Sequence, residues 1–133
     1  MDERTVARWF RGYLADFVAL GRGDEDDVRR LLAHYGVPLL ISTDSGSVSL
    51  SDEDQVLAAA RQQIVGMRAA GYDRSEELSS ATTVVNRSCM LHRAAFTRLR
   101  TDGTEIARVD TTYLITDGPT GPRIAALLGH STG

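Results

Sequence analysis

His92 and Tyr113 are the residues whose types and spacing we select as candidates for chemistry. A neutral imidazole can accept or donate a proton near physiological pH, so His92 is a candidate general acid or base. A phenol beside it can orient the imidazole or polarise a substrate oxygen. The alternative is a buried histidine that is hydrogen-bonded to a neighbouring hydroxyl, which is common in protein cores.

The dipeptide Asp102-Gly103 predicts how these two residues lie relative to each other. If it forms the two-residue hairpin turn that Asp-Gly favours, residues at equal distances from the turn pair across the strands. His92 then lies opposite Tyr113, and both side chains share one face of the sheet. A three-residue loop with a glycine bulge would shift this register and separate the pair.

Strand alternation around this turn predicts one apolar face and one mixed face. Besides the pair, the apolar face carries Met90, Ala94, Phe96, Val109, Thr111 and Ile115. Ligand pockets are usually apolar with a few convergent polar groups, so we assign this face to the interior. Met90, Phe96 and Thr111 are its candidate ligand contacts.

Other reactive residue types give weaker signals. The single Cys89 excludes a disulfide framework and a Cys-rich zinc site, and nothing in the sequence indicates an activating base for it. His34 and His130 lack partners at ligand spacing, so we expect no metal site. The absence of lysine excludes a Schiff-base mechanism and a P-loop. We expect no cofactor.

Length and composition exclude several classes of protein. The 133 residues suffice for about one domain, which we expect over residues 1–133. Apolar residues make up 42% and charged residues 25%, as in globular proteins. A net charge of −3 argues against a nucleic-acid partner. No apolar run approaches the roughly 18 residues of a membrane span. No signal peptide is visible, so we expect no membrane partner and a cytoplasmic protein.

Helical periodicity comes first along the chain, and strand-like composition follows. Helices are expected at residues 4–20, 24–35 and 51–71, and strands near 37–43, 48–50, 77–86, 88–100, 105–116 and 123–129. Gly21 and Gly23 end the first helix, and Ser51 with Asp54 resembles a capping box at the start of the third. This order indicates an α+β domain with a mostly antiparallel sheet.

The order of elements resembles the nuclear transport factor 2-like superfamily and, within it, the SnoaL-like proteins. The resemblance covers nearly the whole chain and rests on three stretches, namely Phe17 to Asp24, Arg98 to Thr104 and Arg123 to Leu127. Pro122 departs from the family, which often has Trp at that place. The resemblance implies a cone, in which a strongly curved sheet wraps around about three helices and a pocket opens at the wide end.

The resemblance also implies two classes of function. Family members include ketosteroid isomerase, a polyketide cyclase, dehydratases and epoxide hydrolases, while others only bind ligands or proteins. We therefore expect a pocket for a small, largely apolar or aromatic molecule, with acid/base isomerase, dehydratase or cyclase chemistry at His92 and Tyr113. The alternative is a non-catalytic ligand-binding or association module. Because the resemblance places the first helix over the cone, Trp9 and Tyr13 are candidates for the pocket mouth, with ordinary core packing as their alternative.

Ketosteroid isomerase offers a sharper comparison, because its site combines a tyrosine, a carboxylate base and a protonated aspartate. Tyr13, Asp44 and Asp110 stand in comparable elements here. Asp44 fits turn chemistry better. Alternation places Asp110 on the outer face, where we expect it to pair with Arg93 or Arg108.

The outer face of the two long strands predicts an assembly. It carries Leu91, Ala95, Leu99, Ile106 and Leu114 beside Arg93, Arg108 and Asp110. Because a continuous exposed apolar surface is a liability on a monomer, we expect a two-fold homodimer through this face. The competing account is that the C-terminal strand and the tail after Leu128 cover the face and leave a monomer.

Overall fold

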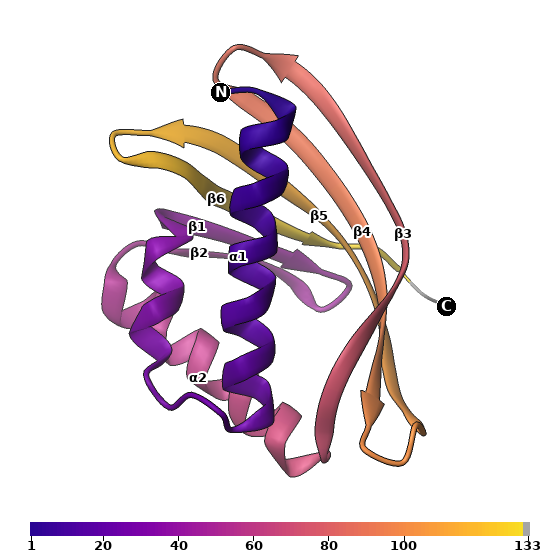
Figure 1. Ribbon diagram of the computed structural model, residues 1–133. Coiled ribbons are helices and arrows are strands. Elements are labelled where there is room, and N and C mark those ends of the chain that lie inside the picture. Colours follow the sequence, from indigo (N-terminus) through magenta and orange to yellow (C-terminus); the bar gives the residue numbers. More distant parts are fainter. Residues whose placement is uncertain (132–133) are drawn as a thin grey trace.

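A computed structural model describes residues 1–131 and shows one curved sheet wrapped around helices (Figure 1). The elements are α1 (Glu3–Arg22), the 3-10 helix η1 (Val28–Ala33), β1 (Tyr35–Thr43), β2 (Gly46–Leu50), α2 (Glu53–Ala69), β3 (Tyr72–Asn86), β4 (Cys89–Arg100), β5 (Glu105–Gly118) and β6 (Gly121–Gly129). The strand order is β2-β1-β6-β5-β4-β3, antiparallel except between β1 and β6. The predicted α+β cone is confirmed.

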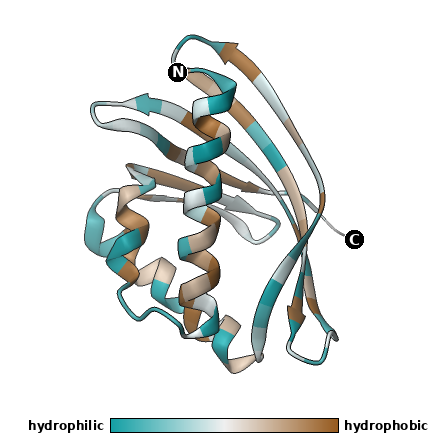
Figure 2. Cartoon of the chain, in the orientation of Figure 1, coloured by the Kyte–Doolittle hydropathy of each residue, from teal (hydrophilic) through white to brown (hydrophobic). Residues whose placement is uncertain are grey.

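Helix α1 is amphipathic and capped at both ends. The Asp2 side chain accepts a hydrogen bond from the Thr5 N–H at 2.8 Å, and Gly23 ends the helix in a left-handed conformation with φ 91°. Its buried residues are Val6, Phe10, Tyr13, Leu20 and Gly21. Figure 2 shows hydrophobic and hydrophilic residues alternating along α1, which lies across the concave face of the sheet. Of the part of the chain that is described, neither α1 nor α2 is apolar over a length that would reach across a bilayer.

The second predicted helix, from Asp24 to Tyr35, is wrong in type and length. Only Val28–Ala33 is helical, as a 3-10 helix, and Tyr35 already belongs to β1. The side chains of Glu25 and Asp27 accept hydrogen bonds from nearby backbone N–H groups at 3.0–3.1 Å. Such local bonds compete with an α-helix. The backbone of Tyr35 pairs with β6 instead, as the first position of a strand.

The β4–β5 hairpin has the predicted register but a different turn. His92 pairs with Tyr113, as expected. The turn is a three-residue loop, in which the Arg100 N–H donates to the Thr104 carbonyl at 2.9 Å and Gly103 has φ 85°. A bulge next to this loop shifts the register back by one residue. The two irregularities cancel, so the pairing beyond them is that of a two-residue turn.

The inner and outer faces of the sheet follow the predicted alternation, except near this bulge. The fully buried residues of the inner face are Met90, Ala94, Tyr113 and Ile115, each at most 7% exposed. The expectation that Leu99 and Ile106 belong to an exposed outer face is wrong. Leu99 is 7% exposed. Ile106 is the residue that the bulge leaves without a pairing partner on β4, and it packs against the core.

Helix α2 and strand β3 begin close to their expected positions. The N-cap of α2 is Asp52, whose side chain accepts a hydrogen bond from the Gln55 N–H at 2.9 Å, one residue after the predicted cap at Ser51. Strand β3 starts earlier than expected, at Tyr72. Gly71, with φ 82°, turns the chain directly from the helix into the strand.

Candidate functional site

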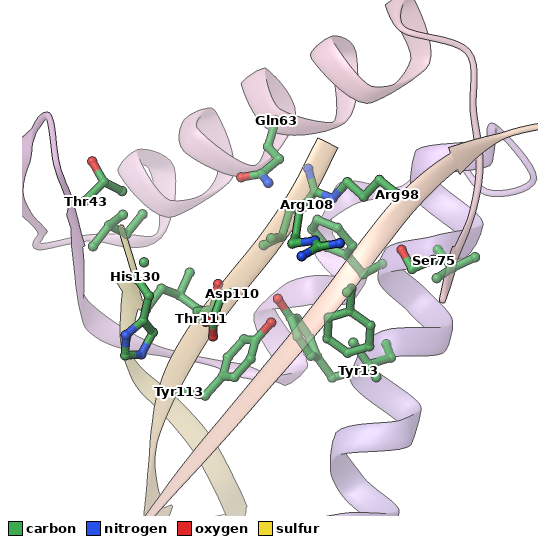
Figure 3. A pocket seen from close by; sticks show the side chains of 18 of the residues that line it. Tyr13, Thr43, Gln63, Ser75, Arg98, Arg108, Asp110, Thr111, Tyr113 and His130 are labelled. Carbon is green, nitrogen blue, oxygen red and sulfur yellow. The ribbon is translucent and has the colours of Figure 1, made fainter. Parts of the chain in front are cut away.

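A cavity of about 990 Å³ lies against the inner face of the sheet, between that face and α1, with Gln63 of α2 also in its wall (Figure 3). Its apolar wall includes Leu14, Phe17, Val18, Ile41, Phe96 and Leu127. Its polar wall includes Tyr13, Tyr35, Arg98, Arg108, Thr111, Tyr113 and His130. Apolar walls with a few polar groups are typical of small-molecule sites.

The periodicity of each element explains how these side chains converge. Tyr13 and Phe17 stand one helical turn apart on α1, so both face the sheet. Alternate residues of a strand share a face, which brings Phe96 and Arg98 of β4 into the wall together. The pair Thr111 and Tyr113 of β5 follows the same rule, and the cavity therefore has an aromatic lining from two sides.

The structure divides the predicted site residues into two groups. Tyr13, Phe96, Thr111 and Tyr113 line the cavity, whereas Trp9, Met90 and His92 do not. For His92 the reason is the Phe10 ring, whose centroid lies 4.4 Å from that of His92. Trp9 packs against the His34 ring, and Met90 is fully buried. The structure therefore moves Trp9, Met90 and His92 out of the candidate site.

His92 is half-buried, and its ring is hydrogen-bonded to a neighbouring hydroxyl. Its Nδ1 lies 2.9 Å from the Thr82 hydroxyl on the neighbouring strand. Its ring and that of Tyr113 share a face as predicted, with centroids 6.3 Å apart. Burial lowers the pKa of His92, opposed by the nearby Glu77 carboxylate. This geometry matches the alternative interpretation, a histidine hydrogen-bonded to a hydroxyl.

A pair of buried tyrosines supplies polar groups to the cavity. The Tyr13 and Tyr35 hydroxyl oxygens are 2.9 Å apart. Burial raises the pKa of Tyr35 to about 12 and also raises the pKa values of Tyr13 and Tyr113, so all three phenols are neutral at physiological pH. Sequence reasoning missed Tyr35 by placing it in a helix. Its alternation with Leu39 and Ile41 along β1 was the available signal.

Arg98 is the second wall residue that sequence reasoning missed. It follows Phe96 by two positions on β4, so the same alternation was the available signal. The guanidinium carbon lies 5.6 Å from the centroid of the Phe17 ring. Burial lowers the pKa of Arg98, which nevertheless stays charged. Among residues 1–131, no side chain forms an ion pair with it.

The sequence matches the family described as NTF2-like protein (DUF6841) over residues 2–132. The chain belongs to this NTF2-like family. A comparison with curated proteins finds no match.

Solved structures share the NTF2-like fold at low sequence identity. An NTF2-like protein of unknown function from Shewanella oneidensis MR-1 has a TM-score of 0.71 and 13% identity, over 98% of this chain and 100% of that chain. A protein from Xanthomonas campestris described as a calcium/calmodulin-dependent protein kinase II association domain has a TM-score of 0.67 and 11% identity, over 97% and 86%. A protein from Shewanella frigidimarina described as a ketosteroid isomerase has a TM-score of 0.60 and 9% identity, over 84% and 85%. All three likenesses concern the fold alone.

The NTF2-like chain differs from the site of ketosteroid isomerase in its acidic residues. Asp44 and Asp110 both reach the cavity wall. Asp110 forms two hydrogen bonds with Arg93, at 3.1 and 2.9 Å, which confirms one of the expected pairings. Arg93 lowers the pKa of Asp110, so this carboxyl is ionised and does not act as a protonated aspartate. Arg108, expected only on the outer face, also reaches the cavity wall.

Proposed function

We propose that this NTF2-like protein binds a small, largely apolar or aromatic molecule in the cavity between α1 and the sheet. The cavity itself carries the proposal, because its volume of about 990 Å³ is ample for a small organic ligand. An association module would have no need of this space and would fill it with side chains. The rings of Tyr13, Phe17 and Tyr113 are available to contact the ligand, and the tyrosine hydroxyls are available to hydrogen-bond it.

Native mass spectrometry of the protein purified from its own cells tests the proposal directly. A small molecule that co-purifies and is released on unfolding is the expected result. A fluorescence titration with N-phenyl-1-naphthylamine, a neutral aromatic probe, measures the same cavity. Val18→Trp, which fills the cavity, should abolish probe binding, whereas Val65→Trp on the exposed side of α2 should leave it unchanged. Equal binding by both variants would overturn the proposal.

A second candidate is acid/base isomerase, dehydratase or cyclase chemistry on the bound molecule. Neutral Tyr113 and the Tyr13–Tyr35 pair favour it, because phenol donors can stabilise negative charge that develops on a carbonyl oxygen. His130 lies in the same wall, with Nε2 2.6 Å from the Thr112 hydroxyl, and is available to accept a proton. Deuterium exchange at the carbons next to the carbonyl of 2-tetralone tests this chemistry. Tyr113→Phe should slow the exchange by a larger factor than it weakens the binding of 2-tetralone.

We also propose that two copies of the chain pair through the outer face of the sheet. On that face Leu91 of β4 is paired with Leu114 of β5, which is paired in turn with Ala126 of β6. Strand β6 lies beside β5 within the sheet, so this strand does not cover the face. A buried area of about 800 Å² per partner would suit a stable dimer.

Light scattering at micromolar concentration separates a dimer from a monomer of 14.5 kDa. Leu91→Asp should lower the mass from twice this value to the monomer mass. Val65→Asp on α2, which is 66% exposed, is the matched control and should leave the dimer intact. A parent protein of 14.5 kDa would overturn the proposal.

A further inference from the structure

Arg98 is a partly buried cation in the cavity wall that has no counter-charge. Its guanidinium carbon lies 5.6 Å from the centroid of the Phe17 ring. Within the described chain it forms neither an ion pair nor a hydrogen bond with another side chain, whereas Arg22 in the same wall pairs with Asp24 and Asp73. Placing a charge in an apolar wall without a partner is unfavourable for folding. Arg98 therefore contributes little to the stability of the fold.

No carboxylate of the cavity wall forms an ion pair with Arg98 within residues 1–131. The three carboxylates of the wall are all engaged by groups of the chain, Asp24 by Arg22, Asp110 by Arg93 and Asp44 by the Ser131 hydroxyl. The tyrosines around Arg98 are neutral phenols, because burial raises their pKa values. Within the described chain Arg98 therefore has no ion-pair partner, and a ligand in the cavity can supply one.

Arg108 is a further arginine of the same wall, which also contains Arg11 and Arg22. It is exposed, and it too has no ion-pair partner among residues 1–131. Figure 3 shows Arg98 and Arg108 in the part of the cavity between Gln63 and the tyrosine rings. Two cations next to an apolar chamber match a molecule with an anionic end and an apolar body.

We propose that Arg98, assisted by Arg108, binds a carboxylate of the ligand, and that the ligands of this protein are small aromatic or aliphatic carboxylates. The inference rests on the proposed binding function and names its ligand class. A guanidinium binds a carboxylate through two parallel N–H···O bonds, which a neutral group of similar shape cannot replace. Within the Tyr13–Tyr35 pair one hydroxyl donates to the other, which leaves one O–H available as an additional donor. The rings of Phe17 and Phe96 accommodate the apolar body.

Binding of 2-naphthoate and its neutral analogue 2-naphthamide, measured by isothermal titration calorimetry, tests the inference. The parent protein should bind the acid at least about tenfold more tightly than the amide, because charge-assisted hydrogen bonds are worth that much. Arg98→Met, which keeps the apolar stem, should abolish this preference and leave the affinity for the amide within about twofold of the parent value. Arg87→Gln, in the turn between β3 and β4, removes the same charge away from the cavity and should change neither affinity.

Each outcome separates this inference from the proposed function. Equal affinities for acid and amide in the parent protein, or an undiminished preference in Arg98→Met, would overturn the carboxylate site while the pocket stands. Failure of both naphthalenes and of the neutral probe to bind would overturn the pocket as well. The melting temperature of Arg98→Met should equal or exceed that of the parent protein. A clear decrease would show that Arg98 stabilises the fold and would contradict the proposed role. If Arg98→Met does not fold, Arg98→Lys serves as the second variant, because it keeps the charge without the planar guanidinium group. This variant should lose part of the preference for the acid over the amide. An unchanged preference would contradict the bidentate contact.

Discussion

The inner face of β4 and β5 has two ends that differ in what covers them. At the closed end, Met90 and Ile115 are fully buried and Phe10 of α1 lies against His92. At the open end, Phe96 and Arg98 face the cavity. Both ends come from the same two strands with the same alternation, so strand pattern alone does not explain the difference.

The path of α1 over the curved sheet makes this difference. The Phe10 ring approaches the rings of His92 and Tyr113 to 4.4 and 4.8 Å between centroids, and so fills the closed end. Further along the helix, Tyr13 and Phe17 border open space instead. The comparison teaches that a pocket forms in this fold where the helix ceases to fill the concave face.

Phe10→Ala should have the largest effect, because it removes the ring that fills the closed end. We expect a loss of about 3–5 kcal/mol in the free energy of unfolding, as for other buried phenylalanines. The matched variant Phe17→Ala, at the open end, should cost about half as much or less while weakening ligand binding. Urea unfolding measures both losses, and equal values would contradict the division into a closed and an open end.

Tyr13→Phe should have an intermediate effect at the border between the two ends. It leaves the buried Tyr35 hydroxyl without its partner at 2.9 Å, which costs about 1–3 kcal/mol. The double variant Tyr13→Phe/Tyr35→Phe should cost less than the sum of the two single changes, because no orphaned hydroxyl remains. Thermal unfolding of the three variants tests this, and strict additivity would show that the two hydroxyls do not interact.

His92 should produce the smallest effect, as a dependence of stability on pH. Burial lowers its pKa from the ordinary value of 6.5, so the unfolded chain takes up a proton at higher pH than the folded protein. Its contribution is therefore unchanged above about pH 6.5 and becomes destabilising as the pH falls below this value. Between pH 7 and pH 5, the free energy of unfolding measured in urea should fall less for His92→Gln than for the parent protein. An identical fall in the two proteins would contradict the burial of His92.

An NMR titration gives an independent check of the same residue. The ring signals of His92 should report a pKa below 6.5 and should not move when 2-naphthoate is added, because Phe10 separates the ring from the cavity. The signals of His130, which lines the cavity, should move. If the His92 signals moved and those of His130 did not, His92 would belong to the ligand site and the assignment of the closed and open ends would be wrong.

Local sequence determined much of this protein. Helical spacing and Asp2 and Gly23 as caps define α1, because both act within a few residues of chain. Strand alternation assigned His92 and Tyr113 to one face, and the register followed from residues close to the turn. The loop type of this hairpin was mistaken, and a bulge nearby restored the predicted register.

Tertiary structure decided which of these residues share a cavity. Tyr35 entered the site because its backbone pairs with β6, a distant strand, rather than continuing a helix. His92 left the site because Phe10, far away in sequence, packs on its ring. Arg98 became a candidate only when every carboxylate of the wall proved to be engaged elsewhere. Alternation predicts the direction of a side chain, whereas its neighbours depend on the curvature of the sheet and on the path of the helix across it, which are properties of the whole packed chain.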